Sequence, residues 1–349
     1  MNRPNKPLRI GIVGLGKMGL IRAGEIQKRP DCAWVCAADP NPPANDQYPG
    51  VEFFTDPEAV IRSDVDAVFI CTPNNITADT VVRALDAGKH VFSEKPPGRS
   101  IAEVESMIAA EKRNPGLKLK FGFNHRYHAG IMEARRIMGS GKLGRLLWMR
   151  GIYGKAGGSG FESSWRSDPE VAGGGILLDQ GIHMLDLFRY FCGDFVECKA
   201  MVTTAYWPIQ VEDNAFALLR DAHGRIAMIH SSSTQWKHRF NLELFFSDGY
   251  LIVNGILSST RSYGDETILV ARKQFDEGFA TGKPREEVIY FDTDPSWQLE
   301  LGEFVECVLE DKPVKVGTSE DAMKVMQMVQ GIYESGGRPS YSFVAEAQR

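Results

Sequence analysis

Two patterns of hydrophobic and polar residues follow each other along the chain. In the first, short apolar runs rich in β-branched residues alternate with segments whose apolar positions have helical spacing. The runs are typical of buried parallel strands, and the pattern predicts strands at residues 8–13, 33–38, 51–54, 65–71, 89–93 and 117–122. Helices are predicted between Gly16 and Pro30, after Asp56, and over 77–87 and 101–112. Such alternation predicts a parallel sheet with right-handed crossovers, in which ligands bind beyond the carboxyl ends of the strands.

Near Phe123 the pattern changes to a helix over 129–138 followed by long strands. These strands are predicted at 145–153, 195–206, 214–220, 225–232, 239–246, 250–254, 267–273 and 287–291. Residues 240–247 alternate apolar and polar, as a sheet with one covered face requires, and Ser-Asp-Gly at 247–249 predicts a hairpin turn. We expect a helix around 177–191 to cover one face and a second subunit to cover the other. A last helix over 320–333 is expected to fold back on the first domain.

The first predicted strand ends in a glycine-rich turn, Gly14-Leu15-Gly16-Lys17-Met18-Gly19, which opens a helix. In this context the glycines allow a tight turn, and backbone N–H groups at the helix N-terminus can approach a pyrophosphate. Asp39 ends the next strand about 20 residues further on, where a dinucleotide fold places the acid that holds the adenosine ribose. Pro-Asn-Pro-Pro follows without a cation for a 2′-phosphate, which favours NAD over NADP. The alternative is a glycine turn whose nearby acid caps a loop.

Composition restricts the classes of partner. The chain has 349 residues, of which 43% are hydrophobic and 24% charged, enough for two globular domains. A net charge of −5 argues against nucleic-acid or anionic-membrane partners. The six cysteines form no C-x-x-C, so neither zinc nor a disulfide framework is predicted. Free thiols, no signal region and no apolar run of transmembrane length lead us to expect a cytoplasmic protein.

Lys95 follows a predicted strand in Glu94-Lys95-Pro96. An ammonium at a strand end can donate to a substrate oxygen and stabilise charge that develops there. Desolvation in a closed cleft would lower its pKa toward the working pH. The alternative is an ordinary surface lysine in a loop.

Asp179 and His183 follow three glycines in a predicted helix. At i and i+4 their Cβ atoms lie about 6 Å apart on one face. A carboxylate beside an imidazole fixes its tautomer and raises its basicity, as a general acid/base requires. The alternative is a histidine–aspartate pair with a purely structural role.

Taken together, these motifs resemble the Gfo/Idh/MocA family of nicotinamide-dependent sugar and polyol oxidoreductases. Residues 65–97 and 312–322 are similar to that family as well, so the resemblance spans essentially the whole chain. It implies an α/β protein with a Rossmann domain over 1–124 and an α+β domain over 125–349. The second domain would contain a large open, mainly antiparallel mixed sheet of the kind commonly used for dimers or tetramers. Thr77 departs from the many members that have histidine after Thr-Pro-Asn.

The resemblance also implies roles for individual residues. His183 would exchange the hydroxyl proton, Asp179 would orient His183, and Lys95 would bind the reacting oxygen within the proton relay. NAD is expected to contact a set of residues at the strand ends: Gly14, Leu15, Gly16, Lys17, Met18, Gly19, Asp39, Thr72, Pro73, Asn74, Glu94 and Lys95.

Substrate contacts are expected from residues near the domain junction and in the second domain: Asn124, Arg126, Tyr127, Trp165, Arg166, His183 and Trp236. Arginines and aromatic rings suit a polyhydroxylated or phosphorylated ligand. The alternative is that the tryptophans are core residues and Arg126 makes an ion pair between the domains. His125, His128 and His183 do not complete a metal-ligand set, so no metal is expected.

We therefore predict an NAD(H)-dependent oxidoreductase that interconverts a secondary alcohol and a ketone on a sugar, sugar nucleotide or cyclic polyol. One alternative is a family member whose NAD cycles in place during elimination or glycoside cleavage. Another is a non-catalytic protein that senses NAD. The expected partners are a small carbohydrate-like substrate and, through the open sheet face, further copies of the chain in a homodimer or homotetramer.

Overall fold

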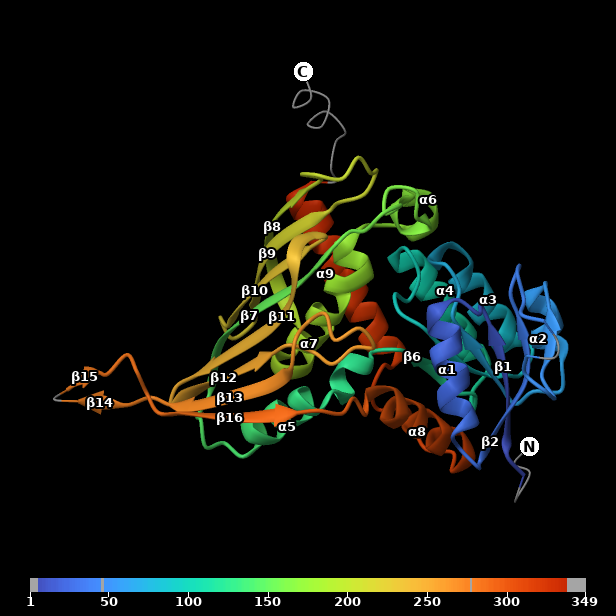
Figure 1. Ribbon diagram of the computed structural model, residues 1–349, viewed down its shortest axis with the longest axis horizontal. Coiled ribbons are helices and arrows are strands. Elements are labelled where there is room, and N and C mark those ends of the chain that lie inside the picture. The colour runs from blue at the N-terminus through green and yellow to red at the C-terminus, as the bar shows by residue number, and fades with distance from the viewer. Residues whose placement is uncertain (1–5, 45–46, 277, 338–349) are drawn as a thin grey trace. The chain divides into compact units, whose positions relative to one another are not determined.

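A computed structural model describes the protein at residues 6–44, 47–276 and 278–337 (Figure 1). These residues form two compact units. The first unit takes in 6–123, 170–173 and 297–326, and the second takes in 124–169, 174–296 and 327–337. The sequence places residues 125–349 in the second domain, with a last helix over 320–333 expected to fold back on the first, and the structure assigns 170–173 and 297–326 to the first unit.

The first unit is built on a six-stranded sheet in the order β3-β2-β1-β4-β5-β6. Every neighbouring pair of strands is parallel, which confirms the predicted parallel sheet. The strands are β1 (Leu8–Val13), β2 (Cys32–Ala38), β3 (Glu52–Phe54), β4 (Ala67–Ile70), β5 (His90–Ser93) and β6 (Leu119–Phe121).

Helices cover both faces of this sheet. They are α1 (Lys17–Gln27), α2 (Pro57–Arg62), α3 (Asn74–Asp86), α4 (Ile101–Arg113) and α8 (Ser296–Leu309). Helix α9 (Ser319–Gly336) begins in the first unit and continues into the second. As predicted, α2 begins after Asp56, whose carboxylate accepts a hydrogen bond from the backbone N–H of Glu58. Helix α3 begins three residues before the predicted start, because Pro73 already supplies an extended N-cap.

Helix α8 is not among the predicted elements. Its buried side chains Leu301, Phe304, Val305 and Val308 have the spacing of one helical face and join the core that α1 and β1 form. Phe304 packs edge-on against both Phe69 and Phe92. This packing explains why a segment so late in the chain belongs to the first unit.

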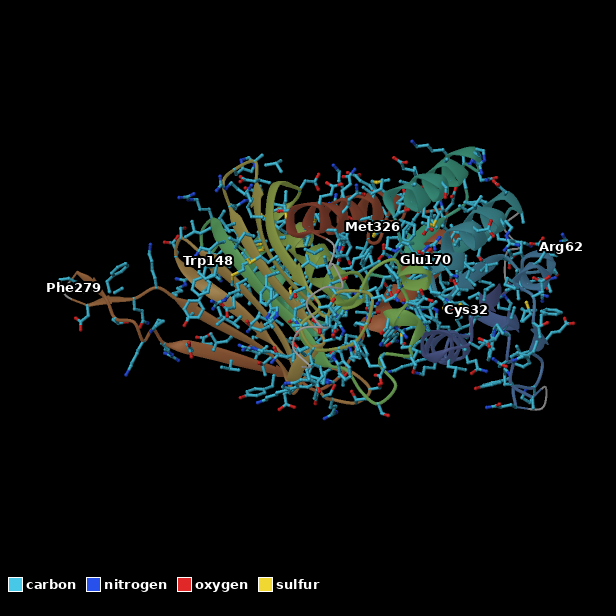
Figure 2. All side chains as sticks on the ribbon, turned by 90° about the horizontal axis from the view of Figure 1, so that it is seen from above. Cys32, Arg62, Trp148, Glu170, Phe279 and Met326 are labelled. Atoms are coloured by element: carbon cyan, nitrogen blue, oxygen red, sulfur yellow. The ribbon has the colours of Figure 1, made fainter. Side chains whose placement is uncertain are left out.

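The second unit is built on an eight-stranded mixed sheet in the order β16-β13-β12-β11-β7-β10-β9-β8. Strands β7 and β10 are parallel, and the other neighbouring pairs are antiparallel, as expected. The strands are β7 (Leu146–Ala156), β8 (Phe195–Thr203), β9 (Asn214–Asp221), β10 (Ile226–Ser232), β11 (Thr234–Phe246), β12 (Gly249–Asn254), β13 (Glu266–Arg272) and β16 (Glu286–Phe291). A separate hairpin pairs β14 (Phe275–Asp276) with β15 (Phe279–Ala280), and Figure 2 shows Phe279 at its end.

The helical segments of the second unit are η1 (Asn124–Tyr127), α5 (Ala129–Gly139), η2 (Trp165–Ser167), η3 (Leu177–Gly181) and α7 (Ile182–Cys192), whereas all but the first residue of α6 (Pro169–Ala172) belongs to the first unit. Helix α7 covers the sheet as predicted (Figure 1). Its side chains Met184 and Phe188 pack on Gly151 of β7. The predicted helix over 177–191 differs at its start, because η3 is a π-helical turn. Within the described ranges, no helix is both long and apolar enough to cross a membrane.

Candidate active site

The glycine turn between β1 and α1 has the conformation that its sequence predicts. Gly14 has a φ of +90°, and a Cβ atom there would lie 2.5 Å from the carbonyl oxygen of Cys71. A Cβ atom on Gly19 would lie 1.9 Å from the carbonyl oxygen of Gly14, so a glycine is needed for the helix to start this close to the turn. Gly16 is the N-cap of α1 without a side-chain cap, and space is open where its Cβ atom would be. The N-terminus of α1 therefore offers backbone N–H groups to an anion.

Asp39 lies directly after β2 and is bonded to this turn. One carboxylate oxygen accepts a hydrogen bond from the backbone N–H of Leu15 at 2.8 Å, and the other accepts one from Asn41 at 2.9 Å. Each oxygen keeps a further lone pair, which can accept a hydroxyl hydrogen from a ribose. The glycine turn, the uncapped helix and the fixed carboxylate together fit a dinucleotide.

Thr72, Pro73 and Asn74, which are predicted to contact NAD, follow β4, and Asn74 is the first residue of α3. The hydroxyl groups of Thr72 and Thr77 lie 2.9 Å apart, and Thr77 also donates to the carbonyl of Pro73. Asn74 is buried and donates to the carbonyl of Ala172 at 2.7 Å. Its amide therefore ties α3 to α6, a role that the sequence analysis does not anticipate.

Glu94 and Lys95 follow β5, and the Lys95–Pro96 peptide bond is cis. The carboxylate of Glu94 accepts a hydrogen bond at 2.7 Å from Arg22, a fully buried side chain of α1. Arg22 also donates to Glu300 of α8 at 2.6 Å, and its guanidinium lies over the ring of Phe92. Burial raises the pKa of Glu300, and the charge of Arg22 offsets only part of this rise. This buried cluster fixes the strand end that carries Lys95 relative to α1.

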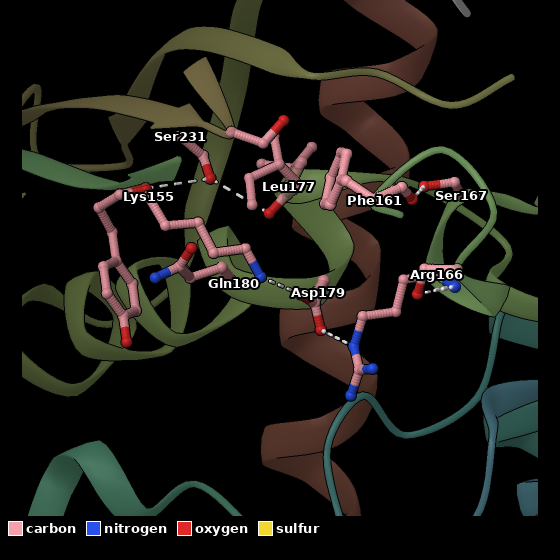
Figure 3. A network of polar contacts seen from close by, with 12 residues as sticks. Lys155, Phe161, Arg166, Ser167, Leu177, Asp179, Gln180 and Ser231 are labelled. Atoms are coloured by element: carbon pink, nitrogen blue, oxygen red, sulfur yellow. Dashed lines mark hydrogen bonds and ion pairs between the residues drawn. The ribbon is translucent and has the colours of Figure 1, made fainter. Parts of the chain in front are cut away.

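In the second unit, Asp179 lies in η3 between two cations (Figure 3). Lys155, at the end of β7, donates to one carboxylate oxygen at 2.9 Å, and Arg166 of η2 approaches the other at 3.4 Å. The guanidinium of Arg166 also lies over the ring of Trp165. The structure thus brings together Asp179 and two of the predicted substrate residues.

His183 lies in the first turn of α7 and is buried. Its ring stacks on that of His125, with ring centroids 3.7 Å apart and an angle of 18° between the planes. His125 in turn bonds to Asn124 and Tyr153. The sequence does not predict this contact, because a ring stack between residues 58 positions apart leaves no local signal.

The remaining predicted substrate residues differ in their burial and contacts. Arg126 is buried and makes two hydrogen bonds to Asp186 of α7, at 2.8 and 2.6 Å. Arg126 therefore makes an ion pair, as the alternative interpretation expects. Its partner lies in the same unit, however, and not in the other domain. Tyr127 is half-buried in η1. Trp236 is 61% exposed on the first part of β11 and packs edge-on against Tyr206, so it is not a core residue.

Lys155 is a functional candidate that the sequence analysis misses. Like Lys95 it stands at the carboxyl end of a strand, and glycines at 154, 157 and 158 surround it. A lysine at a strand end among glycines is a sequence signal that could have identified Lys155 as a candidate. Among the residues that the structure describes, no group of three or more histidine, cysteine, aspartate or glutamate side chains is arranged to hold a metal ion.

Two family models match the chain. Residues 8–122 match the model described as "Oxidoreductase family, NAD-binding Rossmann fold", and residues 131–252 match the "GFO/IDH/MocA C-terminal domain". The two matches cover more than half of the sequence and one falls in each unit. The first match confirms the predicted NAD-binding Rossmann domain.

Several relatives with an assigned activity are dehydrogenases. Myo-inositol 2-dehydrogenase of Thermotoga maritima is 27% identical over 274 residues, which are 74% of this chain and 79% of that enzyme. Levoglucosan dehydrogenase of Pseudarthrobacter phenanthrenivorans is 26% identical over 220 residues, and the match spans 55% of this chain and only 56% of that enzyme. A solved structure of levoglucosan dehydrogenase with NADH and levoglucosan has a TM-score of 0.83 at 21% identity, covering 95% of this chain and 97% of that one. At this identity the structural likeness shows a shared fold.

Proposed function

The chain belongs to the Gfo/Idh/MocA family of oxidoreductases, and from that premise we propose that it interconverts a secondary alcohol and a ketone with NAD(H). The observation that carries this proposal is His183, a buried imidazole one turn after Asp179 in the second unit of a chain whose first unit has an NAD-binding fold. A buried imidazole beside a carboxylate is suited to accept and return one proton.

The chemistry that bound NAD supplies is the acceptance and donation of a hydride. The residues that would hold it are the glycine turn, the N-terminus of α1 and Asp39, with Thr72, Pro73, Asn74 and the Glu94–Lys95 strand end as further contacts. The carboxylate of Asp39 would repel a 2′-phosphate, and this favours NAD over NADP.

The chain's own residues would manage the proton of the substrate hydroxyl. His183 takes that proton as the carbonyl forms and returns it in the reverse direction. Asp179 orients His183, and the ammonium of Lys95 donates to the reacting oxygen and stabilises the negative charge that develops there. Lys155 and Arg166 hold the carboxylate of Asp179 in place.

We infer that the substrate is a sugar, sugar nucleotide or cyclic polyol. The names of the two relatives refer to levoglucosan and myo-inositol, both rich in secondary hydroxyl groups. Arg166 and Trp165 beside Asp179 supply the donor and the aromatic face that such ligands use.

We also infer that the chain forms a homodimer or homotetramer through the outer face of the eight-stranded sheet. Met201 pairs across the strands with Phe216, and Leu218 pairs with Met228, so these side chains share the face opposite α7. Met201 is 76% exposed and Leu218 is 49% exposed. Apolar side chains gathered on an open sheet favour cover by a second copy.

Two substitutions test the proposed chemistry. Lys95→Ala and His183→Gln should each lower kcat by about 100- to 10,000-fold, because each removes a group that acts on the reacting oxygen or its proton. Lys112→Ala and His223→Gln are matched controls at exposed positions and should keep the parental rate. The rates are read from NADH absorbance with a panel of sugars, anhydrosugars, inositols and sugar nucleotides. A Lys95→Ala enzyme as fast as the parent would refute the mechanism.

A further inference from the structure

Two aromatic side chains from two elements of the second unit lie against the ring of His183. His125 of η1 stacks on it with ring centroids 3.7 Å apart, and the ring centroid of Tyr153 of β7 lies 6.4 Å away. His125 is itself 6% exposed, so the stack excludes water from one face of the His183 ring. The proposed mechanism makes no use of His125.

The hydrogen bonds of His125 determine which of its nitrogens carries a hydrogen. Asn124 donates from its amide nitrogen to the hydroxyl of Ser296 at 3.2 Å, which turns its amide oxygen toward His125. That oxygen lies 3.1 Å from Nδ1 of His125 and can only accept. Nδ1 therefore carries the hydrogen, and Nε2 of the neutral ring is left as an acceptor.

Tyr153 supplies the donor for Nε2. Its hydroxyl oxygen lies 3.0 Å from that nitrogen. Burial, together with the nearby Tyr263 and Asp179, raises the pKa of Tyr153, so its hydroxyl keeps its hydrogen at neutral pH. A second proton on His125 would have to sit on Nε2, and the hydroxyl of Tyr153 would then have to turn its hydrogen away and accept instead. The two hydrogen bonds as they stand therefore favour the neutral form of His125.

We infer that His125 is a positioning residue for His183: a neutral imidazole, anchored by Asn124 and Tyr153, that sets the plane of the His183 ring and stabilises its protonated form. The face of a neutral aromatic ring attracts a cation, and this attraction is stronger where water is excluded. The imidazolium that forms when His183 accepts a proton lies on such a face. This role rests on the function proposed for His183, but the ring contact can be tested without turnover.

Other ionisable groups lie near this stack, and two of them have a shifted pKa. Tyr263 hydrogen-bonds to Gln180, and burial raises its pKa to about 12. Burial alone would raise the pKa of Glu266, but hydrogen bonds from His128 and two backbone N–H groups outweigh it, so the pKa is lowered. Asp179 with Lys155, Asp186 with Arg126, and Asp294 beside His128 are further charged neighbours. A label on the histidine rings follows the histidines separately from these groups.

The test is an NMR titration of the free protein with its seven histidines labelled at Cε1. The His183 signal is identified by its loss in His183→Gln. In the parent, the His183 signal should titrate while the His125 signal stays constant from about pH 5 to 9. In His125→Ala the midpoint for His183 should fall by about 0.5 to 1 pH unit, because the stabilising face is gone. With a substrate in hand, kcat should fall about tenfold with little change in KM.

His128→Asn is the matched control. It alters a buried histidine next to His125 but keeps a donor for Glu266 and leaves the stack intact, so the His183 midpoint should not move. If His125→Ala does not fold, Tyr153→Phe replaces it in the test. This substitution removes the hydroxyl that donates to Nε2, so the His125 signal should begin to titrate. The inference is overturned if His125 titrates in the parent, or if the His183 midpoint is unchanged in His125→Ala. Failure of the proposed dehydrogenase activity would leave these spectra unaffected, so the two claims can fail separately.

Discussion

The carboxylate of Asp39 is held by two backbone N–H groups that lie on either side of it in the sequence. Leu15 belongs to the glycine turn and Asn41 to the loop after β2. Two such bonds keep the carboxylate at the carboxyl end of β2, where an adenosine ribose is held in dinucleotide folds. Its negative charge is therefore fixed at that strand end, and this is the physical basis for the proposed preference for NAD.

Asp39→Asn should weaken NADH binding about tenfold and reduce the preference for NADH over NADPH. The amide can still accept from Leu15 but loses the charge that strengthens hydrogen bonds to the ribose and repels a 2′-phosphate. Both dissociation constants can be measured by tryptophan-fluorescence titration. Asp56→Asn, which alters the N-cap of α2, is the control and should bind both nucleotides as the parent does. An unchanged ratio of the two constants would contradict the assignment of Asp39.

At the residue scale, the sequence singles out Lys95, Asp179 and His183 as candidates because each lies in a short local motif. It does not reveal the side chains that these candidates contact. Lys155 and Arg166 meet Asp179 only because β7 and η2 are brought beside η3 by the fold. The stack of His125 on His183 likewise depends on how η1 packs against α7.

At the scale of elements, periodicity predicted the strands of both sheets and most helices. It could not reveal the π turn of η3, since five residues do not separate a π pattern from an α pattern. The backbone N–H groups of Gly175 and Leu177 donate to the buried carboxylate of Glu212, so the start of this segment is fixed by a contact that is distant in the sequence. Helix α8 was missed although Leu301, Phe304, Val305 and Val308 have clear helical spacing.

The outer face of the eight-stranded sheet leads to a prediction at the same scale. If a second copy covers it, a protein with Met201→Lys and Phe216→Lys should sediment as a 38.8 kDa monomer while the parent sediments as a dimer or tetramer. The two charges would be buried without partners in the interface. Leu309→Lys, at an exposed position in α8, is the control and should leave the assembly intact. A parent protein that sediments as a monomer would contradict the proposal.

At the scale of the whole molecule, the chain does not divide at a single point. The first unit recovers 170–173 and 297–326 from the later sequence, because α8 completes its core and Asn74 binds the carbonyl of Ala172. The sequence gives little sign that these two later segments belong to the first unit, since the pattern of predicted strands and helices changes only once, near Phe123. The matches of the two family models, one in each unit, assign the NAD-binding fold to the first unit and leave the candidate base, His183, in the second.

The most direct test of the central claim is the ratio of NADH formed to ketone formed by the purified protein. NADH is followed by its absorbance and the ketone by mass spectrometry, with NAD in excess and each member of the carbohydrate panel in turn. A dehydrogenase that transfers one hydride from a secondary alcohol should give one NADH per ketone, and neither product should accumulate with His183→Gln. Conversion of a substrate with no net NADH would instead show that NAD cycles in place and would contradict the proposed function.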